Sequence, residues 1–283
     1  SQGLANYLLH TGQAQAGVAI AYDSRRNSAL FAKETALTLA ANGVHAYLYD
    51  KLTSVPQLSF TVLQLHCAAG VVITASHNPA KYNGYKVYGA DGGQIANAGA
   101  DAIIEQINAI EDPFSIATIT EEAALASGYL HYIGEELDRA YYEQVKTLCR
   151  DATWLRDKAR QVHIVYTPLH GSGLKSVCSV LTELGVENLF VVEQQRAPDC
   201  NFPTVSAPNP ENQEAFDLAI PLANQHKADL ILATDPDCDR LGVAVRKHDS
   251  QFTLLTGNQI GCLLLEYLLS TRQTPPDAFV VKS

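Results

Sequence analysis

The chain of 283 residues contains no uninterrupted apolar run near the roughly 20 residues that a membrane-spanning helix needs. Its first ten residues, SQGLANYLLH, show no basic region followed by an apolar stretch, so no signal peptide is expected. From these two absences we expect a cytoplasmic protein that has no membrane partner.

Basic residues are also few, because 20 Lys and Arg stand against 30 Asp and Glu and give a formal net charge of −10. An acidic chain repels the phosphate backbone of nucleic acids, so we expect no nucleic-acid partner. If the ligand is nevertheless an anion, the cations that bind it must be gathered locally.

The cysteines lack the spacing of a metal or redox motif. No C-x-x-C pair occurs, and the six residues are scattered at Cys67, Cys149, Cys178, Cys200, Cys238 and Cys262. We therefore expect neither a zinc site nor a disulfide framework, as is typical of a reducing compartment.

What the sequence does contain is typical of a globular protein, with 47% hydrophobic and 18% charged residues. Apolar strand patterns are expected at 17–22, 44–49, 70–74, 85–88, 162–166, 189–192, 230–233, 241–245 and 252–255. Helices between them are expected to start at Ser28 and Pro56 and to cover 103–110, 137–148, 174–184, 211–227 and 258–269.

This alternation predicts an α/β protein with two consecutive βαβ domains, whose mixed sheets are mainly parallel, and the start of a third similar domain. We place the domains at residues 1–129, 130–254 and 255–283. Because the chain opens inside a helical pattern and ends just after an apolar stretch at 279–281, we expect a part of a longer protein. The stretch 279–281 is predicted to be the first strand of the third domain. Residues 113–129 are predicted to be irregular. Residues 211–227 are predicted to form one helix that is kinked at Pro221.

Ligands of parallel α/β sheets bind beyond the carboxyl ends of the strands. This rule selects the loops 23–27, 75–83, 167–172 and 235–240.

The loop 235–240 carries alternating carboxylates at Asp235, Asp237 and Asp239. Residues two apart in an extended loop point the same way, and converging like charges need a counter-ion such as a hard divalent cation. An EF-hand is excluded because Arg240 and Arg246 stand where it needs Gly and Glu. A solvated acidic turn and an Asp235 nucleophile of the haloacid-dehalogenase type stay open, although the third Asp and Arg240 favour a metal site.

The loop 75–83 presents Ser76 beside His77, which could hold or shuttle a proton. Lys81 and Lys86 bring cations to the same place, as an anion site requires. A serine that stabilises the turn is the alternative interpretation. No G-x-S-x-G elbow is present, which disfavours acyl transfer.

Two further loops give weaker signals. Arg25 and Arg26 could donate to a phosphate or could be solvated. The HGSG segment 170–173 matches a dinucleotide fingerprint only partly, since Ser176 replaces its third Gly. We interpret it as close backbone packing with His170 facing the cleft. No Walker A sequence is present.

Several of these segments together resemble the α-D-phosphohexomutase family, most of all its bacterial phosphoglucomutases of the long type. TASHNP at 74–79 with NGYK at 83–86 resembles the family's phosphoserine loop, and DPDCDR at 235–240 resembles its metal loop. YDSR at 22–25 is similar to its N-terminal arginine segment, and GNQIG at 257–261 to the entry of its third domain.

The resemblance implies a phosphorylated Ser76 and a Mg²⁺ ion held by Asp235, Asp237, Asp239 and an oxygen of that phosphoserine. It further implies that Arg25 and Arg240 steady the phosphoryl group, and that His77 and Lys86 transfer protons to and from the sugar. Lys86 would also bind phosphate. The charges of three Asp side chains and a phosphoserine sum to about −5. Arg25, Lys86 and Arg240 would offset the negative charge that the metal ion leaves uncompensated.

The implied reaction interconverts glucose 1-phosphate and glucose 6-phosphate through a 1,6-bisphosphate that also acts as activator. A mannose or pentose phosphate substrate, or a non-catalytic metal-binding fragment, is the alternative. Family members have four domains, so the resemblance implies that the chain alone is inactive. The sequence predicts no oligomeric state.

Overall fold

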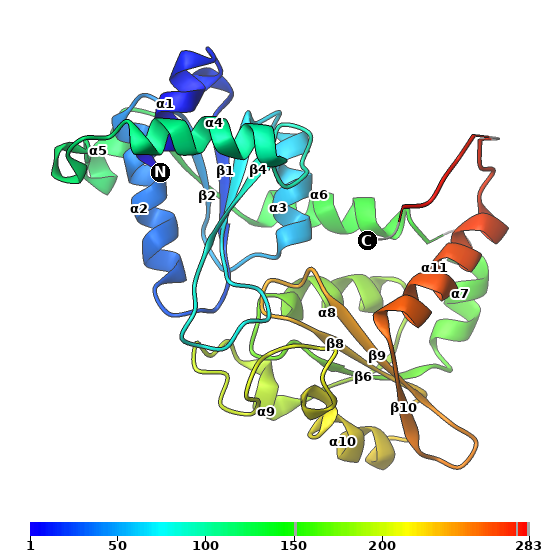
Figure 1. The fold of residues 1–283 in the computed structure, drawn as a ribbon. Helices are drawn as coiled ribbons and strands as arrows, with labels where there is room; N and C mark the ends of the chain where they lie inside the picture. The colour runs from blue at the N-terminus through cyan, green and yellow to red at the C-terminus, as the bar shows by residue number, and fades with distance from the viewer. Residues whose placement is uncertain (150–151, 276, 282–283) are drawn as a thin grey trace.

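The computed structural model describes residues 1–149, 152–275 and 277–281, which form two α/β units (Figure 1). Each unit contains one five-stranded sheet with helices on its faces, and most strand pairs within the sheets are parallel. The predicted fold class is therefore confirmed.

The first sheet has the order β4-β3-β1-β2-β5, in which only β4 runs antiparallel to its neighbour. Its strands are β1 (Val18–Tyr22), β2 (Ala46–Tyr49), β3 (Ala69–Ile73), β4 (Tyr85–Gly89) and β5 (Leu130–Ile133). β1 lies in the centre, and its Val18 is in register with Ala46 of β2 and Ala69 of β3. Its side chains are apolar throughout, as a strand covered on both faces requires.

Alternate side chains of β1 pack into the two hydrophobic cores of this unit. Val18 and Ile20 pack with α1 and α2, whereas Ala19 and Ala21 pack with α3. The helices of the unit are α1 (Gln2–His10), α2 (Ser28–Ala41), α3 (Val55–Gln64), α4 (Asn97–Asn108) and α5 (Glu121–Ala126). Two 3₁₀ turns lie at Ala14–Ala16 and Pro113–Ser115.

The second sheet has the order β10-β9-β8-β6-β7. Its strands are β6 (His163–Thr167), β7 (Asn188–Val191), β8 (Leu230–Thr234), β9 (Leu241–Arg246) and β10 (Phe252–Leu255). β9 and β10 form the predicted antiparallel hairpin. The helices are α6 (Glu135–Lys146), α7 (Ala152–Ala159), α8 (Gly173–Glu183), α9 (Glu193–Arg196), α10 (Ala219–Gln225) and α11 (Gly257–Thr271).

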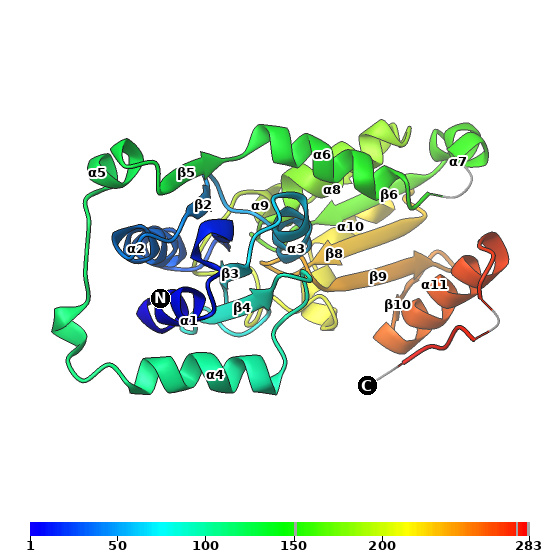
Figure 2. The same cartoon turned by 90° about the horizontal axis from the view of Figure 1, so that it is seen from above.

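Helix α6 joins the two units. It contacts α3 of the first unit and α8 of the second, and Figure 2 shows it running beside both. Its amphipathic sequence places Leu137 and Tyr142 in the interior together with one charged residue, Asp138.

Several local predictions were wrong. Residues 211–227 are not one helix, because a 3₁₀ turn (Gln213–Phe216) and α10 are separated at 217–218. The break does not fall at Pro221, which lies in the first turn of α10, where a missing backbone N–H removes no helical hydrogen bond. The described residues 279–281 form no strand and are exposed, since no strand of the described chain lies beside them.

The segment 113–129 is less irregular than predicted. It contains α5, which Thr120 caps by accepting a hydrogen bond from the backbone N–H of Ala123 at 3.3 Å. Strand β5 follows directly and was not predicted. It pairs with β2, so residues 130–133 lie in the first sheet although the proposed boundary at 129/130 precedes them.

Among the described residues, no helix combines the length and the apolar character that crossing a bilayer requires.

Candidate active site

Loops from the two sheets meet where Ser76 faces Asp235. The Ser76 hydroxyl donates a hydrogen bond to Asp235 Oδ2 at 2.8 Å, although the two residues lie 159 positions apart. Ser76 follows β3 of the first sheet, and Asp235 follows β8 of the second. The carboxyl ends of these strands therefore point at a common site, as the strand-end rule predicts for α/β sheets.

Both loops turn through strained backbone conformations. Ser76 has φ of +51° and Cys238 has φ of +57°, a region that residues other than Gly seldom adopt. The Ser76 N–H donates to Thr74 Oγ1 at 2.8 Å, which helps to hold this turn. Such conformations cluster where a rigid structure presents a functional group, here the Ser76 hydroxyl.

The three carboxylates of the second loop converge. One oxygen from each of Asp235, Asp237 and Asp239 lies within 4.8 Å of the others. Burial, followed by repulsion from the other two carboxylates, raises the pKa of Asp235 to about 8. Burial and the charge of Asp237 likewise raise the pKa of Asp239.

One atom of this cluster is left without a partner. Asp237 Oδ1 is buried and has no hydrogen-bond partner among the described residues. A buried carboxylate oxygen that lacks a donor is costly unless a cation or another unseen group satisfies it. Together with the hard oxygen donors of the cluster, this orphan atom fits a Mg²⁺ ion.

Lys86 supplies a positive charge to the cluster. Its ammonium group lies 2.9 Å from Asp237 Oδ2 and 3.4 Å from Asp239 Oδ2. Burial alone would lower the pKa of Lys86, but the two carboxylates outweigh it and raise that pKa. Lys86 is therefore a protonated side chain within reach of the candidate metal position.

Arg25 lies beneath the Ser76 loop. Its guanidinium donates to four backbone carbonyls of that loop, those of Ser76, Asn78, Pro79 and Tyr82. The side chain is fully buried, 3.3 Å from Asp23, and its guanidinium lies over the Phe202 ring at 5.0 Å. In this position Arg25 fixes the shape of the loop, and its predicted steadying of a phosphoryl group stays a prediction.

Asp23 also holds the Ser76 loop in place, a role that was not predicted from the sequence. It accepts hydrogen bonds from the Arg25 backbone N–H and the Ser28 hydroxyl, both at 2.9 Å. The Thr74 hydroxyl lies 2.7 Å from Asp23 Oδ2 and 3.1 Å from Asp237 Oδ2, so it joins the two loops. The available signal was the position of Asp23, which directly follows β1 and stands two residues before Arg25.

His77 and Arg240 stand at the rim. The His77 Nδ1 atom lies 3.3 Å from the Ser76 hydroxyl, and burial together with the Arg240 charge lowers the pKa of His77. The imidazole is thereby favoured in its neutral form, which can accept a proton. The Arg240 N–H donates to Asp235 Oδ1 at 3.0 Å, while its guanidinium lies 3.4 Å from Glu211.

The HGSG loop supports the acidic loop from below. Ser172 donates to the Pro236 carbonyl through both its N–H and its hydroxyl, each at 2.8 Å. A Cβ on Gly171 would stand 2.4 Å from Pro236 Cα, so the predicted close backbone packing is confirmed. The predicted exposure of His170 to the cleft was wrong, because its ring is buried and bonded to the Ala197 carbonyl and the Thr204 hydroxyl.

We expect Gly171→Ala to displace the acidic loop and to weaken Mg²⁺ binding at least about tenfold, the usual effect of disturbing the support of a metal site. The measurement is a Mg²⁺ titration in which the unfolding temperature reports how much metal is bound. Gly261→Ala is the control, because a Cβ at Gly261 in α11 meets nothing within 4 Å. Equal Mg²⁺ affinity in the two variants would contradict the supporting role of the HGSG loop.

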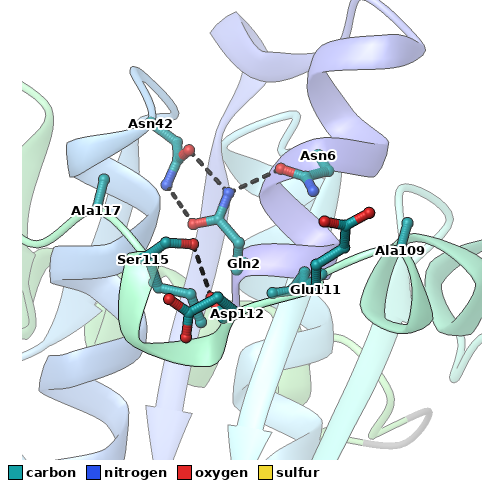
Figure 3. Close-up of a pocket in the computed structure, with 10 residues that line it drawn as sticks. Gln2, Asn6, Asn42, Ala109, Glu111, Asp112, Ser115 and Ala117 are labelled. Carbon is teal, nitrogen blue, oxygen red and sulfur yellow. Dashed lines mark hydrogen bonds between the residues drawn. The ribbon is translucent and has the colours of Figure 1, made fainter.

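A pocket of about 520 Å³ lies elsewhere in the first unit (Figure 3). The amide of Gln2 bridges Asn42 and Asn6 there, with hydrogen bonds of 2.7–2.9 Å. Asn42 ends α2, which places the pocket near the amino ends of the parallel strands, away from Ser76. Its lining includes Glu111 and Asp112 and none of the predicted site residues. We therefore locate the chemistry at the acidic loop and not in this pocket.

Comparison with known proteins gives one family for most of the chain. Residues 1–114 match the family described as phosphoglucomutase/phosphomannomutase, alpha/beta/alpha domain I, and residues 139–248 match its domain II.

Relatives and solved structures agree with this match. A phosphoglucomutase of Staphylococcus saprophyticus is 41% identical over 264 residues, which are 93% of this chain and 47% of that protein. One of Staphylococcus haemolyticus is 38% identical over 281 residues, 99% of this chain and 50% of that protein. The chain thus spans about half the length of the curated relatives it matches.

Among solved structures, a Thermus thermophilus protein assigned as a phosphomannomutase superposes with a TM-score of 0.78 at 24% identity. The match covers 95% of this chain and 56% of that one. At this identity the likeness concerns the fold.

Proposed function

The chain belongs to the phosphoglucomutase/phosphomannomutase family, and from this premise we propose that the protein interconverts glucose 1-phosphate and glucose 6-phosphate. The observation that carries the proposal is the hydrogen bond of 2.8 Å between the Ser76 hydroxyl and Asp235 inside the acidic cluster. This contact supports the proposal, because Ser76 would act as the nucleophile that carries a phosphoryl group beside the candidate metal site.

Asp235, Asp237 and Asp239 would hold Mg²⁺, with a phosphoryl oxygen on Ser76 as a further ligand. The orphan Oδ1 of Asp237 and the all-oxygen donor set support this assignment. When bound, Mg²⁺ would neutralise part of the charge that gathers on the transferred phosphoryl group.

The remaining groups would move protons and offset charge. As the Ser76 Oγ–P bond breaks, a sugar hydroxyl oxygen would form the new O–P bond, and neutral His77, whose Nδ1 lies 3.3 Å from the Ser76 hydroxyl, would accept the hydroxyl proton. Protonated Lys86 would return a proton to the sugar oxygen in the reverse transfer, and the proton taken up by His77 would restore Lys86, so that both groups end as they began. Lys86 and Arg240 would offset the negative charge of the incoming phosphate, while Arg25 keeps the serine loop in position.

Transfer in the two directions gives the isomerisation. Phosphorylated Ser76 would give its phosphoryl group to either monophosphate and form glucose 1,6-bisphosphate. This intermediate would reorient in the site and phosphorylate Ser76 again with its other phosphoryl group. Added glucose 1,6-bisphosphate would therefore act as an activator by phosphorylating Ser76. Catalysis of this kind depends mostly on positioning and on charge stabilisation.

The choice of glucose follows the names of the staphylococcal relatives. Mannose and pentose phosphates are the alternatives within the same chemistry. A non-catalytic function is the alternative to an enzyme. In that case the 283-residue chain by itself would bind a metal ion without catalysing a reaction. We propose that this chain alone is inactive, because binding of the remote part of a substrate contributes to catalysis.

The test is turnover by the full-length protein with Mg²⁺ and glucose 1,6-bisphosphate, offered glucose 1-phosphate, mannose 1-phosphate or ribose 1-phosphate. We expect kcat/KM for the glucose ester to exceed the others at least about tenfold, which corresponds to the ~1.4 kcal/mol that one lost hydrogen bond to a sugar hydroxyl costs. A higher kcat/KM for the mannose or the ribose ester would show that glucose was the wrong choice of sugar. Absence of turnover with all three would refute the mutase proposal.

A further inference from the structure

A buried carboxylate outside the candidate active site connects the two units. Asp138 of α6 is 2% exposed. Its Oδ2 atom binds the ammonium groups of Lys175 at 2.6 Å and Lys51 at 2.9 Å, and its Oδ1 atom accepts a hydrogen bond from the Gln57 amide. Gln57 belongs to α3 in the first unit, and Lys175 belongs to α8 in the second. Asp138 thus ties one helix of each unit to α6.

The two helices that Asp138 ties are the ones whose first residues hold the acidic loop. At the start of α3, the Val55 N–H donates to the Asp237 carbonyl at 2.8 Å. At the start of α8, Ser172 donates twice to the Pro236 carbonyl at 2.8 Å. Adjacent carbonyls of the loop are therefore held from the two units by helices that share the carboxylate of Asp138.

Loss of this carboxylate would act on the loop through both helices. It would remove the counter-charge that the two lysines share, leaving Lys51 with the more distant Asp50 Oδ1 at 3.9 Å, and would weaken the hydrogen bond from the Gln57 amide. The ammonium groups would then repel, so the starts of α3 and α8 would move apart. Because metal sites tolerate displacements of only a fraction of an ångström, a small separation is enough to weaken the site.

We propose that Asp138 is a positioning residue for the metal loop: by holding α3 and α8 together it sets the backbone of residues 236–237, and so the carboxylates around the candidate Mg²⁺ site. This inference rests on the proposed function, which supplies the metal. Asp138 touches neither the metal ligands nor Ser76 among the described contacts, so its effect travels through the two helices.

The experiment titrates the full-length protein with Mn²⁺ and follows free Mn²⁺ by electron paramagnetic resonance, well below the unfolding temperature. Asp138→Asn is expected to weaken Mn²⁺ binding about tenfold, the usual cost of losing an outer-shell support. Glu183→Gln is the matched control. It removes the ion pair of 2.6 Å between Lys146 of α6 and Glu183 of α8, which joins the same two helices, and it should leave the affinity unchanged.

Two more variants make the outcome decisive. Asp235→Asn removes a proposed ligand and must abolish binding; if it does not, the proposed function itself fails. If Asp235→Asn abolishes binding but Asp138→Asn lowers only the unfolding temperature, the positioning role is overturned while the mutase proposal stands. Should Asp138→Asn not fold, Lys175→Gln decides, because Lys51 still pairs with the carboxylate. A weakened Mn²⁺ affinity then supports the proposal, and an unchanged affinity overturns it.

Discussion

Ser76→Ala is expected to lower mutase turnover at least about a thousandfold, because it removes the oxygen that carries the phosphoryl group between the two halves of the reaction. The loop itself should keep its shape. The four carbonyls that Arg25 binds are backbone groups, and none of them depends on the Ser76 hydroxyl. The loss would therefore report on chemistry and not on folding.

The measurement is the intact mass of the full-length protein after incubation with glucose 1,6-bisphosphate and Mg²⁺. Wild type should gain one phosphoryl group and Ser76→Ala none. Ser206→Ala is the control, because its hydroxyl also donates to a carboxylate, Glu214, but outside the site. That variant should be phosphorylated like wild type.

The same measurement separates a phosphoserine from a phosphorylated aspartate. If Asp235 were the nucleophile, Ser76→Ala would still gain the phosphoryl group, and hydroxylamine would remove it. A phosphoserine is stable to hydroxylamine. Retention of a hydroxylamine-sensitive phosphate in Ser76→Ala would contradict the assignment of Ser76.

Asp235→Asn is expected to stabilise the metal-free protein at pH 8 while abolishing its response to Mg²⁺. Burial and the neighbouring carboxylates raise the pKa of Asp235 to about 8, well above its ordinary value of 3.8. A raised carboxyl pKa means that the folded state binds the proton more tightly than the unfolded state. The resulting stabilisation is complete below pH ~4 and is lost as the pH rises towards 8.

The asparagine is neutral at every pH, so it avoids that loss. We expect a gain of about 2 kcal/mol in the free energy of unfolding at pH 8 in EDTA, and hardly any gain at pH 4. Mg²⁺ should raise the unfolding temperature of wild type, by linkage of binding to folding, and leave that of Asp235→Asn unchanged.

Calorimetric unfolding at the two pH values, with EDTA or Mg²⁺, measures both effects. Asp249→Asn is the control, since Asp249 also accepts a backbone hydrogen bond at 3.0 Å but lies in the exposed hairpin turn. Its unfolding should respond to Mg²⁺ as wild type does. A less stable Asp235→Asn in EDTA at pH 8 would show that the three carboxylates do not repel one another as described.

Hydrophobic periodicity predicted much of the fold, because buried parallel strands such as β1 and β3 are apolar on both faces and stand out from their neighbours. β5 gave no such signal, since this edge strand mixes buried Leu130 with His131 and exposed Tyr132. In the segment 211–227 the pattern of apolar residues predicted one helix, whereas the backbone leaves the helical path before Pro221.

The candidate site divides in the same way. Ser76 and the acidic trio follow strands and match family motifs, so the sequence was enough to select them. The supporting residues depend on contacts between distant parts of the chain, such as Asp138 with Lys175 and Arg25 with Tyr82. No periodicity or local spacing encodes those contacts, and only the packed structure brings them into view.

The central claim is that Ser76 and the three carboxylates surround one metal ion, and diffraction from a crystal of the full-length protein soaked with Mn²⁺ tests it most directly. We predict one strong anomalous peak about 2.1 Å from oxygens of Asp235, Asp237 and Asp239 and from the oxygen on Ser76, the distance typical of a small hard cation. An anomalous peak away from the three carboxylates would contradict the account. So would a fully occupied Mn²⁺ ion that the three carboxylates bind without the oxygen on Ser76.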